Sequence, residues 1–322
     1  MMQEILKVED LTVGYGDVEI VRDVSFSVEK GEILGIVGES GCGKSTLMKA
    51  VMQLMGPNAY IPKGSIHFAG KDLLSISAEE MRQLRGDRLG VVFQNPGVTL
   101  NPLRKIKAQF IETMRSHKQI GKEEALASIL QMLAKLNLPE GERVLQSYPF
   151  ELSGGMNQRV ALALAMIMEP ELILADEPTS ALDVTVQAQA VEEMLRLREQ
   201  FGTAIIIVTH SMGVIAHMVD RVGVMYAGRM IEYGDKADVM AHTAHPYTRA
   251  LMDAIPSLDG TLPVGIEGHP PTFQEAATGC AFAPRCRHCV DACRTTVPEL
   301  RAVGGSCHKT SCIRVQEGGL KL

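Results

Sequence analysis

One stretch, Gly38-Glu39-Ser40-Gly41-Cys42-Gly43-Lys44-Ser45-Thr46, constrains the fold most, because it fits the pattern GxxxxGK[ST]. It follows the apolar run 33–37 and leads into 47–52, so a buried strand, a glycine-rich turn and a helix are expected in that order. Glycines let successive backbone N–H groups face phosphate oxygens, and the helix N-terminus adds a positive field. Lys44 is expected to reach the β- and γ-phosphates, and Ser45 to bind Mg²⁺. The sequence therefore predicts an ATP or GTP site.

Composition narrows the class of protein around this loop. The 322 residues are 46% hydrophobic, which is ample for a packed core with room for one large and one smaller domain. No run reaches eighteen uncharged apolar residues and no signal sequence is recognisable, so we expect a chain that neither spans a membrane nor is exported. The net charge of −6 argues against a general nucleic-acid surface.

Hydrophobic periodicity predicts an α/β core with two additions. Residues 5–30 alternate as half-buried antiparallel strands would, and a second strand pair is expected in 63–74. Apolar residues recur at intervals of four within 103–147, which predicts a helical subdomain set into the core. Buried core strands are expected at 89–93, at 172–178, where the strand ends in two acids, and at 204–210, where it ends in a histidine.

Polar side chains follow these core strands at their carboxyl ends, where open α/β sheets bind ligands. Asp176 is a candidate Mg²⁺ ligand, and Glu177 is placed to orient or deprotonate an attacking water. Gln94 could contact the metal, and His210 the γ-phosphate. A loop-capping amide, a helix-capping acid and a structural histidine are the alternatives for these positions.

Two further stretches are candidates for nucleotide contacts. Ser153, Gly154 and Gly155 precede an apolar helix expected at 160–168, which gives a second anion-accepting N-terminus without a lysine. Two such helix starts in one chain indicate a nucleotide shared between two molecules. Tyr15 stands between two glycines, where its ring could stack on a purine or simply pack on its own strands.

Taken together, these motifs resemble those of the ATP-binding subunit of an ABC transporter. GESGCGKST looks like Walker A, Gln94 like the Q-loop, LSGGM at 152–156 like the signature, and LILADE at 172–177 like Walker B. SALD at 180–183 is similar to the D-loop, Thr209-His210 to the switch histidine and Tyr15 to the adenine-stacking A-loop. The resemblance implies a P-loop NTPase fold and ATPase activity. Its nucleotide contacts would be Tyr15, Gly38, Ser40, Gly41, Cys42, Gly43, Lys44, Ser45, Thr46, Gln94, Asp176, Ser153, Gly154 and Gly155, with Ser45, Gln94 and Asp176 on Mg²⁺.

The segment after residue 240 resembles one branch of that family. Residues 244–251 (AHPYTRAL) and 279–286 (GCAFAPRC) are similar to elements of the oligopeptide, dipeptide and nickel importers. Met156 departs from the commonest signature, but methionine is frequent there in this branch. The expected domains are 1–240, an ATP-binding domain with a helical subdomain at about 100–165, and 241–322, a cysteine-bearing C-terminal extension.

This resemblance implies an importer motor with catalytic roles for Glu177, His210, Gln94 and Lys44. Two nucleotide subunits would close head to tail over ATP and open after hydrolysis. The implied partners are a second ATP-binding subunit, expected to be a paralogue, two membrane-spanning permeases and an external binding protein. The chain would lie on the cytoplasmic face of the inner membrane. Peptide is the first expectation for cargo and nickel or another chelated metal the second; a non-transport ABC ATPase for translation or DNA repair is the main competing class.

Cysteines gather at one end of the chain. Cys280, Cys286, Cys293 and Cys307 give four thiolates, the number that a [4Fe–4S] cluster needs, and the family resemblance points the same way. Structural zinc is the runner-up, and free thiols remain a third possibility. Cys289 is an extra thiol that complicates the assignment. Cys42 stands apart at a helix N-terminus, where a thiol pKa is expected to fall and oxidation could follow. A small residue tolerated in the loop is the preferred interpretation.

Overall fold

A computed structural model describes residues 3–95, 99–138, 140–180, 183–255, 265–304 and 307–322. By their internal contacts these residues form two units, which are described separately. Unit 1 comprises Met1–Ile5, Glu29–Glu32 and Ser75–Ile207, and unit 2 comprises Leu6–Val28, Ile33–Leu74 and Val208–Leu322. The predicted division near residue 240 is a division of the sequence and stays a prediction.

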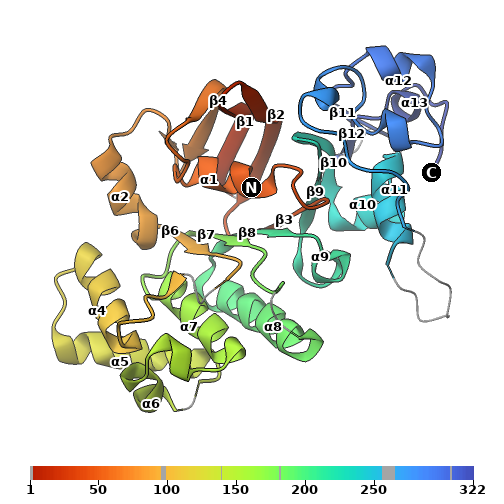
Figure 1. Cartoon of the computed structure of the whole chain (residues 1–322). Coiled ribbons are helices and arrows are strands. Elements are labelled where there is room, and N and C mark those ends of the chain that lie inside the picture. The colour runs from red at the N-terminus through yellow and green to blue at the C-terminus, as the bar shows by residue number, and fades with distance from the viewer. Residues whose placement is uncertain (1–2, 96–98, 139, 181–182, 256–264, 305–306) are drawn as a thin grey trace. The chain divides into compact units, whose positions relative to one another are not determined.

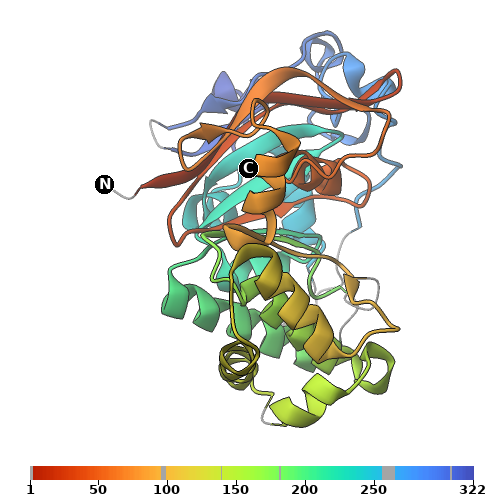
Figure 2. The same cartoon turned by 90° about the vertical axis from the view of Figure 1, so that its left-hand side faces the viewer.

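Unit 1 contains the predicted helical subdomain and two core strands. Its elements are α2 (Ala78–Asp87), β6 (Leu89–Val92), α4 (Ile106–His117), α5 (Lys122–Lys135), α6 (Gly141–Gln146), η1 (Pro149–Glu151), α7 (Gly154–Met166), β7 (Leu172–Asp176) and α8 (Val184–Phe201). Strand β8 (Ala204–Thr209) begins in this unit and ends in the other. The helices α4 to α8 lie together as one group (Figures 1 and 2).

The helical part of unit 1 forms where the apolar spacing predicted it. Ile106, Phe110 and Met114 of α4 are buried, as are Ala125 and Ile129 of α5, and α4 packs against α5. Helix α2 is closed by a capping box, in which the Ser77 side chain accepts from the N–H of Glu80 and the Glu80 carboxylate accepts from Ser77. Core strands β6 and β7 pair in parallel, so their carboxyl ends reach the same edge.

Unit 2 contains the phosphate loop, an antiparallel sheet and the C-terminal region. The N-terminal elements are β1 (Glu4–Tyr15), β2 (Val18–Glu29), β3 (Ile33–Val37), α1 (Lys44–Val51), β4 (Ala59–Phe68) and β5 (Lys71–Asp72). The C-terminal elements are α9 (Met212–Met218), β9 (Arg221–Tyr226), β10 (Arg229–Asp235), α10 (Lys236–Ala241), α11 (Pro246–Asp253), η2 (Glu275–Ala277), η3 (Ala283–Arg285), α12 (Asp291–Thr295), β11 (Arg301–Ala302), β12 (Lys309–Thr310) and α13 (Ile313–Gln316).

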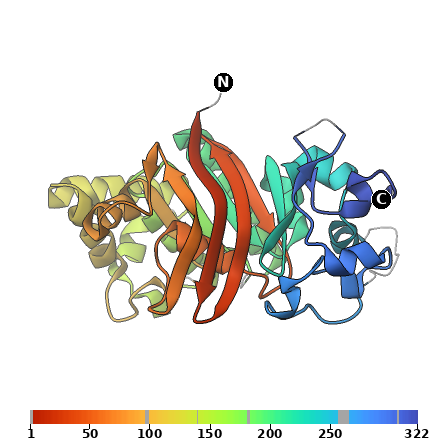
Figure 3. The same cartoon turned by 90° about the horizontal axis from the view of Figure 1, so that it is seen from above.

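Two sets of strands organise unit 2. A four-stranded sheet has the order β2-β1-β4-β5, with β1 antiparallel to β4, and its long strands lie side by side in Figure 3. The predicted antiparallel subdomain is therefore present. Strand β3, which carries the phosphate loop at its end, pairs in parallel with β9, and β9 pairs antiparallel with β10. Strand β12 of the C-terminal region adds to β10, so this region joins the sheet that holds the loop.

Candidate functional site

The phosphate loop connects β3 to α1 as predicted. Gly43 caps α1 with a φ of 106°, and Gly41 has a φ of 79°, so both occupy backbone conformations that favour glycine. The Lys44 side chain is buried, and its ammonium donates to the carbonyl oxygens of Gly38 at 2.7 Å and Glu39 at 3.0 Å. Ser40 and Ser45 are exposed beside it, and Thr46 is half-buried. The loop thus presents its lysine and hydroxyls around the start of a helix.

Cys42 differs from the sequence expectation. Its side chain is buried, and burial raises the pKa of the thiol, although the Lys44 ammonium acts in the opposite direction. The lowered thiol pKa expected from the helix N-terminus is therefore wrong, because desolvation outweighs the favourable charge.

Two other predicted nucleotide contacts lie in unit 2 with the loop. Tyr15 ends β1 with its ring half-buried, so part of the ring remains open to a stacking partner. His210 is exposed and directly follows β8, and Ser211 then caps α9 by accepting from the N–H of Val214. The position of His210 agrees with the predicted strand end, whereas Tyr15, expected in a turn, is the last residue of a strand. Their contacts with nucleotide stay predictions.

Gln94 and Glu177 meet in unit 1. They follow the neighbouring parallel strands β6 and β7, and the Gln94 side-chain amide donates to the Glu177 carboxylate at 3.1 Å. Asp176 ends β7 half-buried beside them. Glu177 has a φ of 46°, a left-handed conformation that is costly for a residue with a side chain and that recurs at functional sites. Strand pairing and local strain thus aim an acid and an amide at one place.

The predicted anion-accepting helix start is also in unit 1. Helix α7 begins at Gly154, not at Val160 as expected from the apolar pattern, because the Ser153 hydroxyl caps it by accepting from the N–H of Met156. Ser153 and Gly154 are exposed, and Gly155 is half-buried. The start of this thirteen-residue helix therefore lies at the surface. Of the D-loop stretch 180–183, residues 181–182 lie outside the described part of the chain.

Two polar contacts that the sequence analysis missed hold α7 in place. The buried Gln158 side chain donates to the carbonyl oxygen of Pro178, one residue beyond Glu177. Arg159 pairs with Glu193 of α8, and these two charged atoms lie 2.8 Å apart with Glu193 only 2% exposed. Polar residues directly after the LSGGM stretch were the available signal. They connect the helix start to the Glu177 segment and to α8.

The cysteines at the C-terminal end surround a small cavity in unit 2. It is lined by Cys280, Cys286, Cys293 and Cys312, together with His245, Pro246, Phe282, Ala283, His288, Pro298, Ser311, Ile313 and Arg314. Cys307, the fourth predicted ligand, is exposed and does not line this cavity, whereas Cys312 does. Cys289 is half-buried, and its thiol donates to the carbonyl oxygen of Val290. The structure thus brings three of the four predicted cysteines together with a different fourth.

Burial shifts the pKa values of several side chains that line this cavity. Burial, with a smaller effect from the neighbouring thiols, raises the pKa of Cys280 to about 12, and burial also raises the pKa values of Cys286 and Cys312. Burial lowers the pKa of His245 to about 3. Among the described residues, no three histidine, cysteine or acidic side chains are arranged to hold one metal ion. The predicted metal at these cysteines, whether a [4Fe–4S] cluster or zinc, therefore finds no support in the arrangement of the described side chains.

Comparisons with known proteins agree with the fold and the motifs. The ABC transporter family model matches residues 21–180, and the model of the oligopeptide/dipeptide transporter C-terminal region matches 231–293. The oligopeptide transport ATP-binding protein OppD of Escherichia coli is 43% identical over 300 residues, which are 91% of this chain and 89% of that protein. The dipeptide transport ATP-binding protein DppD of Bacillus subtilis is 40% identical over 318 residues, which are 97% of this chain and 95% of that protein.

Solved structures give the same fold. The dimeric post-hydrolysis ATP-binding cassette MJ0796 with ADP and phosphate has a TM-score of 0.64 and 26% identity, covering 72% of this chain and 99% of that one. CbiO1 of Clostridium perfringens, part of the cbiONQ transporter complex, has a TM-score of 0.66 and 27% identity, covering 74% and 91%. The predicted P-loop NTPase class is confirmed, and so is its ABC type. The chain belongs to the ATP-binding protein family of the oligopeptide and dipeptide ABC transporters.

Proposed function

We propose that this chain is the ATP-hydrolysing motor subunit of a binding-protein-dependent importer of di- and oligopeptides. The observation that carries the proposal is the pairing of Glu177 with Gln94 at the ends of β7 and β6, in a chain whose phosphate loop holds Lys44 at a helix start. Relatives named for oligopeptide and dipeptide transport support peptide as the cargo over nickel. The proposed partners are two permeases, an external binding protein and a paralogous second ATP-binding subunit. We place this chain at the cytoplasmic face of the inner membrane.

In this mechanism, Lys44 and the loop amides hold the phosphates of ATP, and Tyr15 stacks on the base. Ser45, Gln94 and Asp176 would hold Mg²⁺, which would neutralise charge on the phosphates. Ser153, Gly154 and Gly155 of a second subunit cover the γ-phosphate, since an exposed helix N-terminus attracts an anion. Glu177 orients or deprotonates the attacking water. His210 steadies the γ-phosphate, and Gln94 would reach the metal once it is released from Glu177. Hydrolysis removes the shared γ-phosphate, and the two subunits separate.

The test of this function is Glu177→Gln in the assembled transporter. General-base catalysis contributes roughly 10²–10⁴ in rate, so we expect ATP turnover and peptide uptake to fall about that far while the ATP-bound closed dimer accumulates. Glu171→Gln is the matched control, because Glu171 lies just before the other end of β7, where it pairs with Arg88. Turnover close to that of the unsubstituted protein in Glu177→Gln would contradict the role of Glu177. Co-purification with ribosomes or DNA and no permease would overturn the importer assignment.

We also propose that the cysteine cavity holds a [4Fe–4S] cluster, with Cys312 taking the place first predicted for Cys307. Four thiols line one cavity. A cluster spreads its four thiolate ligands over several irons, so the four sulfur atoms need not all bind one ion. Such a group would supply a covalent brace for the C-terminal region, and no electron-transfer role is assigned to it.

The cluster is tested by absorption spectra and by iron and sulfide analysis of anaerobically purified protein. Cys312→Ala is expected to lower the bound iron and sulfide severalfold, because each cluster iron needs a thiolate. Cys307→Ala is the matched control and is expected to retain both, since its thiol is exposed outside the cavity. If Cys307→Ala loses the iron and sulfide and Cys312→Ala retains them, Cys307 is the fourth ligand, as first predicted. Stoichiometric zinc without sulfide would replace the cluster by a structural zinc site.

A further inference from the structure

The phosphate loop is tied to the C-terminal region through Glu39. Its two carboxylate oxygens accept from the two terminal guanidinium nitrogens of Arg285, at 2.7 Å and 3.0 Å. This is the bidentate geometry that makes an arginine–carboxylate pair both strong and directional. Glu39 is the second residue of the loop, and Arg285 immediately precedes Cys286 of the cysteine cavity. One ion pair therefore connects the two sites.

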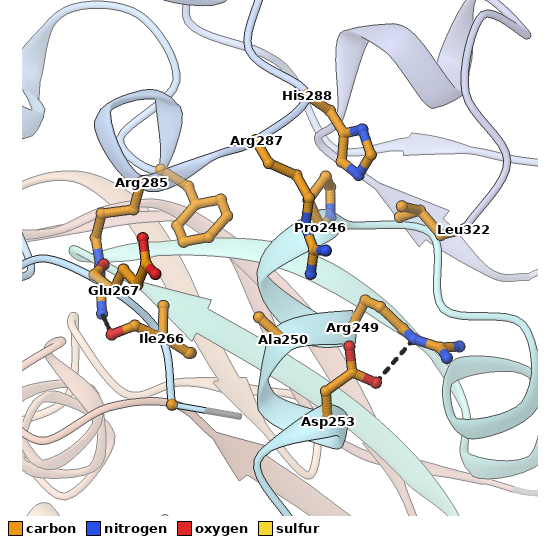
Figure 4. A pocket seen from close by; sticks show the side chains of 12 residues that line it. Pro246, Arg249, Ala250, Asp253, Ile266, Glu267, Arg285, Arg287, His288 and Leu322 are labelled. Atoms are coloured by element: carbon orange, nitrogen blue, oxygen red, sulfur yellow. Dashed lines mark hydrogen bonds and ion pairs between the residues drawn. The ribbon is translucent and has the colours of Figure 1, made fainter. Parts of the chain in front are cut away.

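Arg285 is held rigidly for this contact. Its Nε donates to the carbonyl oxygen of Glu267 at 2.9 Å, and a terminal nitrogen donates to that of Ile266 at 3.3 Å; the three residues lie beside one another in Figure 4. The Tyr226 hydroxyl accepts a further bond at 3.1 Å. With the two bonds to Glu39, these contacts use all five guanidinium N–H donors. The side chain is only 4% exposed, and the hydrogen bonds to Glu39 raise its pKa, so it stays charged.

The backbone of Glu39 is held from the same side. Its N–H donates to the Tyr247 hydroxyl at 2.8 Å, and Tyr247 is fully buried. Tyr247 packs against the rings of Tyr226 and Phe282, with centroids 4.5 Å and 5.4 Å away. Such aromatic contacts fix the position of the hydroxyl. Both the side chain and the amide of Glu39 are therefore positioned by residues after 225.

This constraint reaches the lysine that binds phosphate. The Lys44 ammonium donates to the carbonyl oxygens of Gly38 and Glu39, so the position of this backbone sets where the ammonium lies. Added bulk at Gly38 would collide with the carbonyl oxygen of Met225, the neighbour of Tyr226, so the loop packs directly on β9. A shift of Glu39 would move the carbonyl groups and the lysine together.

We propose that Arg285 and Tyr247 are positioning residues for nucleotide binding, which hold the phosphate loop through Glu39. The proposal rests on the proposed function of Lys44 and adds that the cysteine-bearing region is needed for full ATP affinity. Arg285 touches no nucleotide in this scheme and acts only through Glu39. Disturbance of the segment around Cys286 would therefore weaken ATP binding from a distance.

The experiment measures the MgATP dissociation constant of the full chain, and KM and kcat of the assembled transporter. Arg285→Ala should raise both the dissociation constant and KM about tenfold, a loss of about 1.4 kcal/mol, and leave kcat at saturating ATP nearly unchanged. Arg285→Lys should give an intermediate value, because lysine keeps the charge but not the bidentate fork. Tyr247→Phe removes only the hydroxyl and should weaken binding severalfold. Arg287→Ala is the matched control: it flanks Cys286 on the other side and is exposed.

A double substitution separates positioning from general stabilisation. If Arg285 acts through Glu39, Arg285→Ala should cost little further affinity in a Glu39→Gln background. The inference would be overturned if the losses of ATP affinity in the double variant were additive, or if Arg287→Ala lost as much affinity as Arg285→Ala. Unchanged ATP affinity in both Arg285→Lys and Tyr247→Phe would also overturn it. Lys44→Ala serves as the reference for the nucleotide site itself. Normal ATP binding by Lys44→Ala would refute the proposed function. If Lys44→Ala loses ATP binding and the substitutions of Arg285 and Tyr247 do not, only the positioning role is refuted.

Discussion

Single residues in the phosphate loop work under tight steric limits. Gly38 is fully enclosed, and a Cβ at this position would meet both the carbonyl oxygen of Met225 and, at 2.8 Å, the sulfur of Cys42. The backbone oxygen cannot move without disturbing β9, which pairs with β3. The requirement for glycine here therefore comes from close packing, whereas at Gly43 it comes from the left-handed backbone.

This packing predicts the effect of Gly38→Ala. Overpacking of a tight site costs about 1–3 kcal/mol, and relief of the clash would displace the loop and its Lys44. We expect a lower melting temperature and a loss of measurable ATP binding. Gly121→Ala is the control, because Gly121 has a φ of −68° and no atom lies within 4 Å of the added carbon. Unchanged ATP affinity in Gly38→Ala would show that the loop accommodates the methyl group and that the close packing is unimportant.

At the scale of elements, the sequence predicts what depends on local chemistry. The strand, loop and helix around Lys44 and the buried faces of α4 and α5 follow from glycine spacing and apolar periodicity. These features need no knowledge of distant partners.

Other features depend on tertiary contacts that no local pattern encodes. Cys312 lines the cysteine cavity and Cys307 does not, although the count of four thiolates and the family resemblance had favoured Cys307. The raised pKa of Cys42 reflects burial, which outweighs the helix terminus beside it. The contact of Glu39 with Arg285 joins residues 246 positions apart. Helix α7 was placed too late because its first turn is polar, although Ser153 was recognised as preceding a helix.

The orientation of α7 gives a prediction at this scale. Glu193 of α8 is 2% exposed and pairs with Arg159 of α7 at 2.8 Å, so Glu193→Ala would leave a guanidinium without its carboxylate in a largely buried place. Loss of such a partner costs about 1–3 kcal/mol, and we expect the denaturant midpoint to fall accordingly. Glu192→Ala is the control, because Glu192 is the neighbour of Glu193 in the sequence and its own side chain is exposed. Equal stability of the two variants would mean that the pair contributes nothing to holding the helix.

For the chain as a whole, the residues proposed to act on nucleotide belong to two units. Lys44, Tyr15 and His210 belong to one, and Asp176, Glu177 and the Ser153 helix start to the other. None of the described helices combines the length and the apolar character that crossing a membrane requires. A motor of this kind must couple events in both units, and the C-terminal region is built into the one that carries the phosphate loop.

The attachment of that region can be tested at His308. Strand β12 adds to β10 at Thr310 and Lys309, and His308 lies 2.7 Å from the fully buried carboxylate of Glu232 on β10. The same Glu232 oxygen accepts from the N–H of Ala244, so one acid fixes two segments of the C-terminal region. Removal of the imidazole would leave this carboxylate short of a partner in the interior, which costs about 1–3 kcal/mol.

His308→Ala should therefore loosen the C-terminal region before the rest of the chain. Hydrogen exchange at the amides of 307–316 is expected to speed up by one to two orders of magnitude, since about 1.4 kcal/mol corresponds to a factor of ten. Amides of α4 and α5 should exchange at their original rates. Lys309→Ala is the control, because its exposed side chain leaves the Glu232 contact in place. Uniformly faster exchange throughout the chain would instead mean that this region unfolds only together with the core.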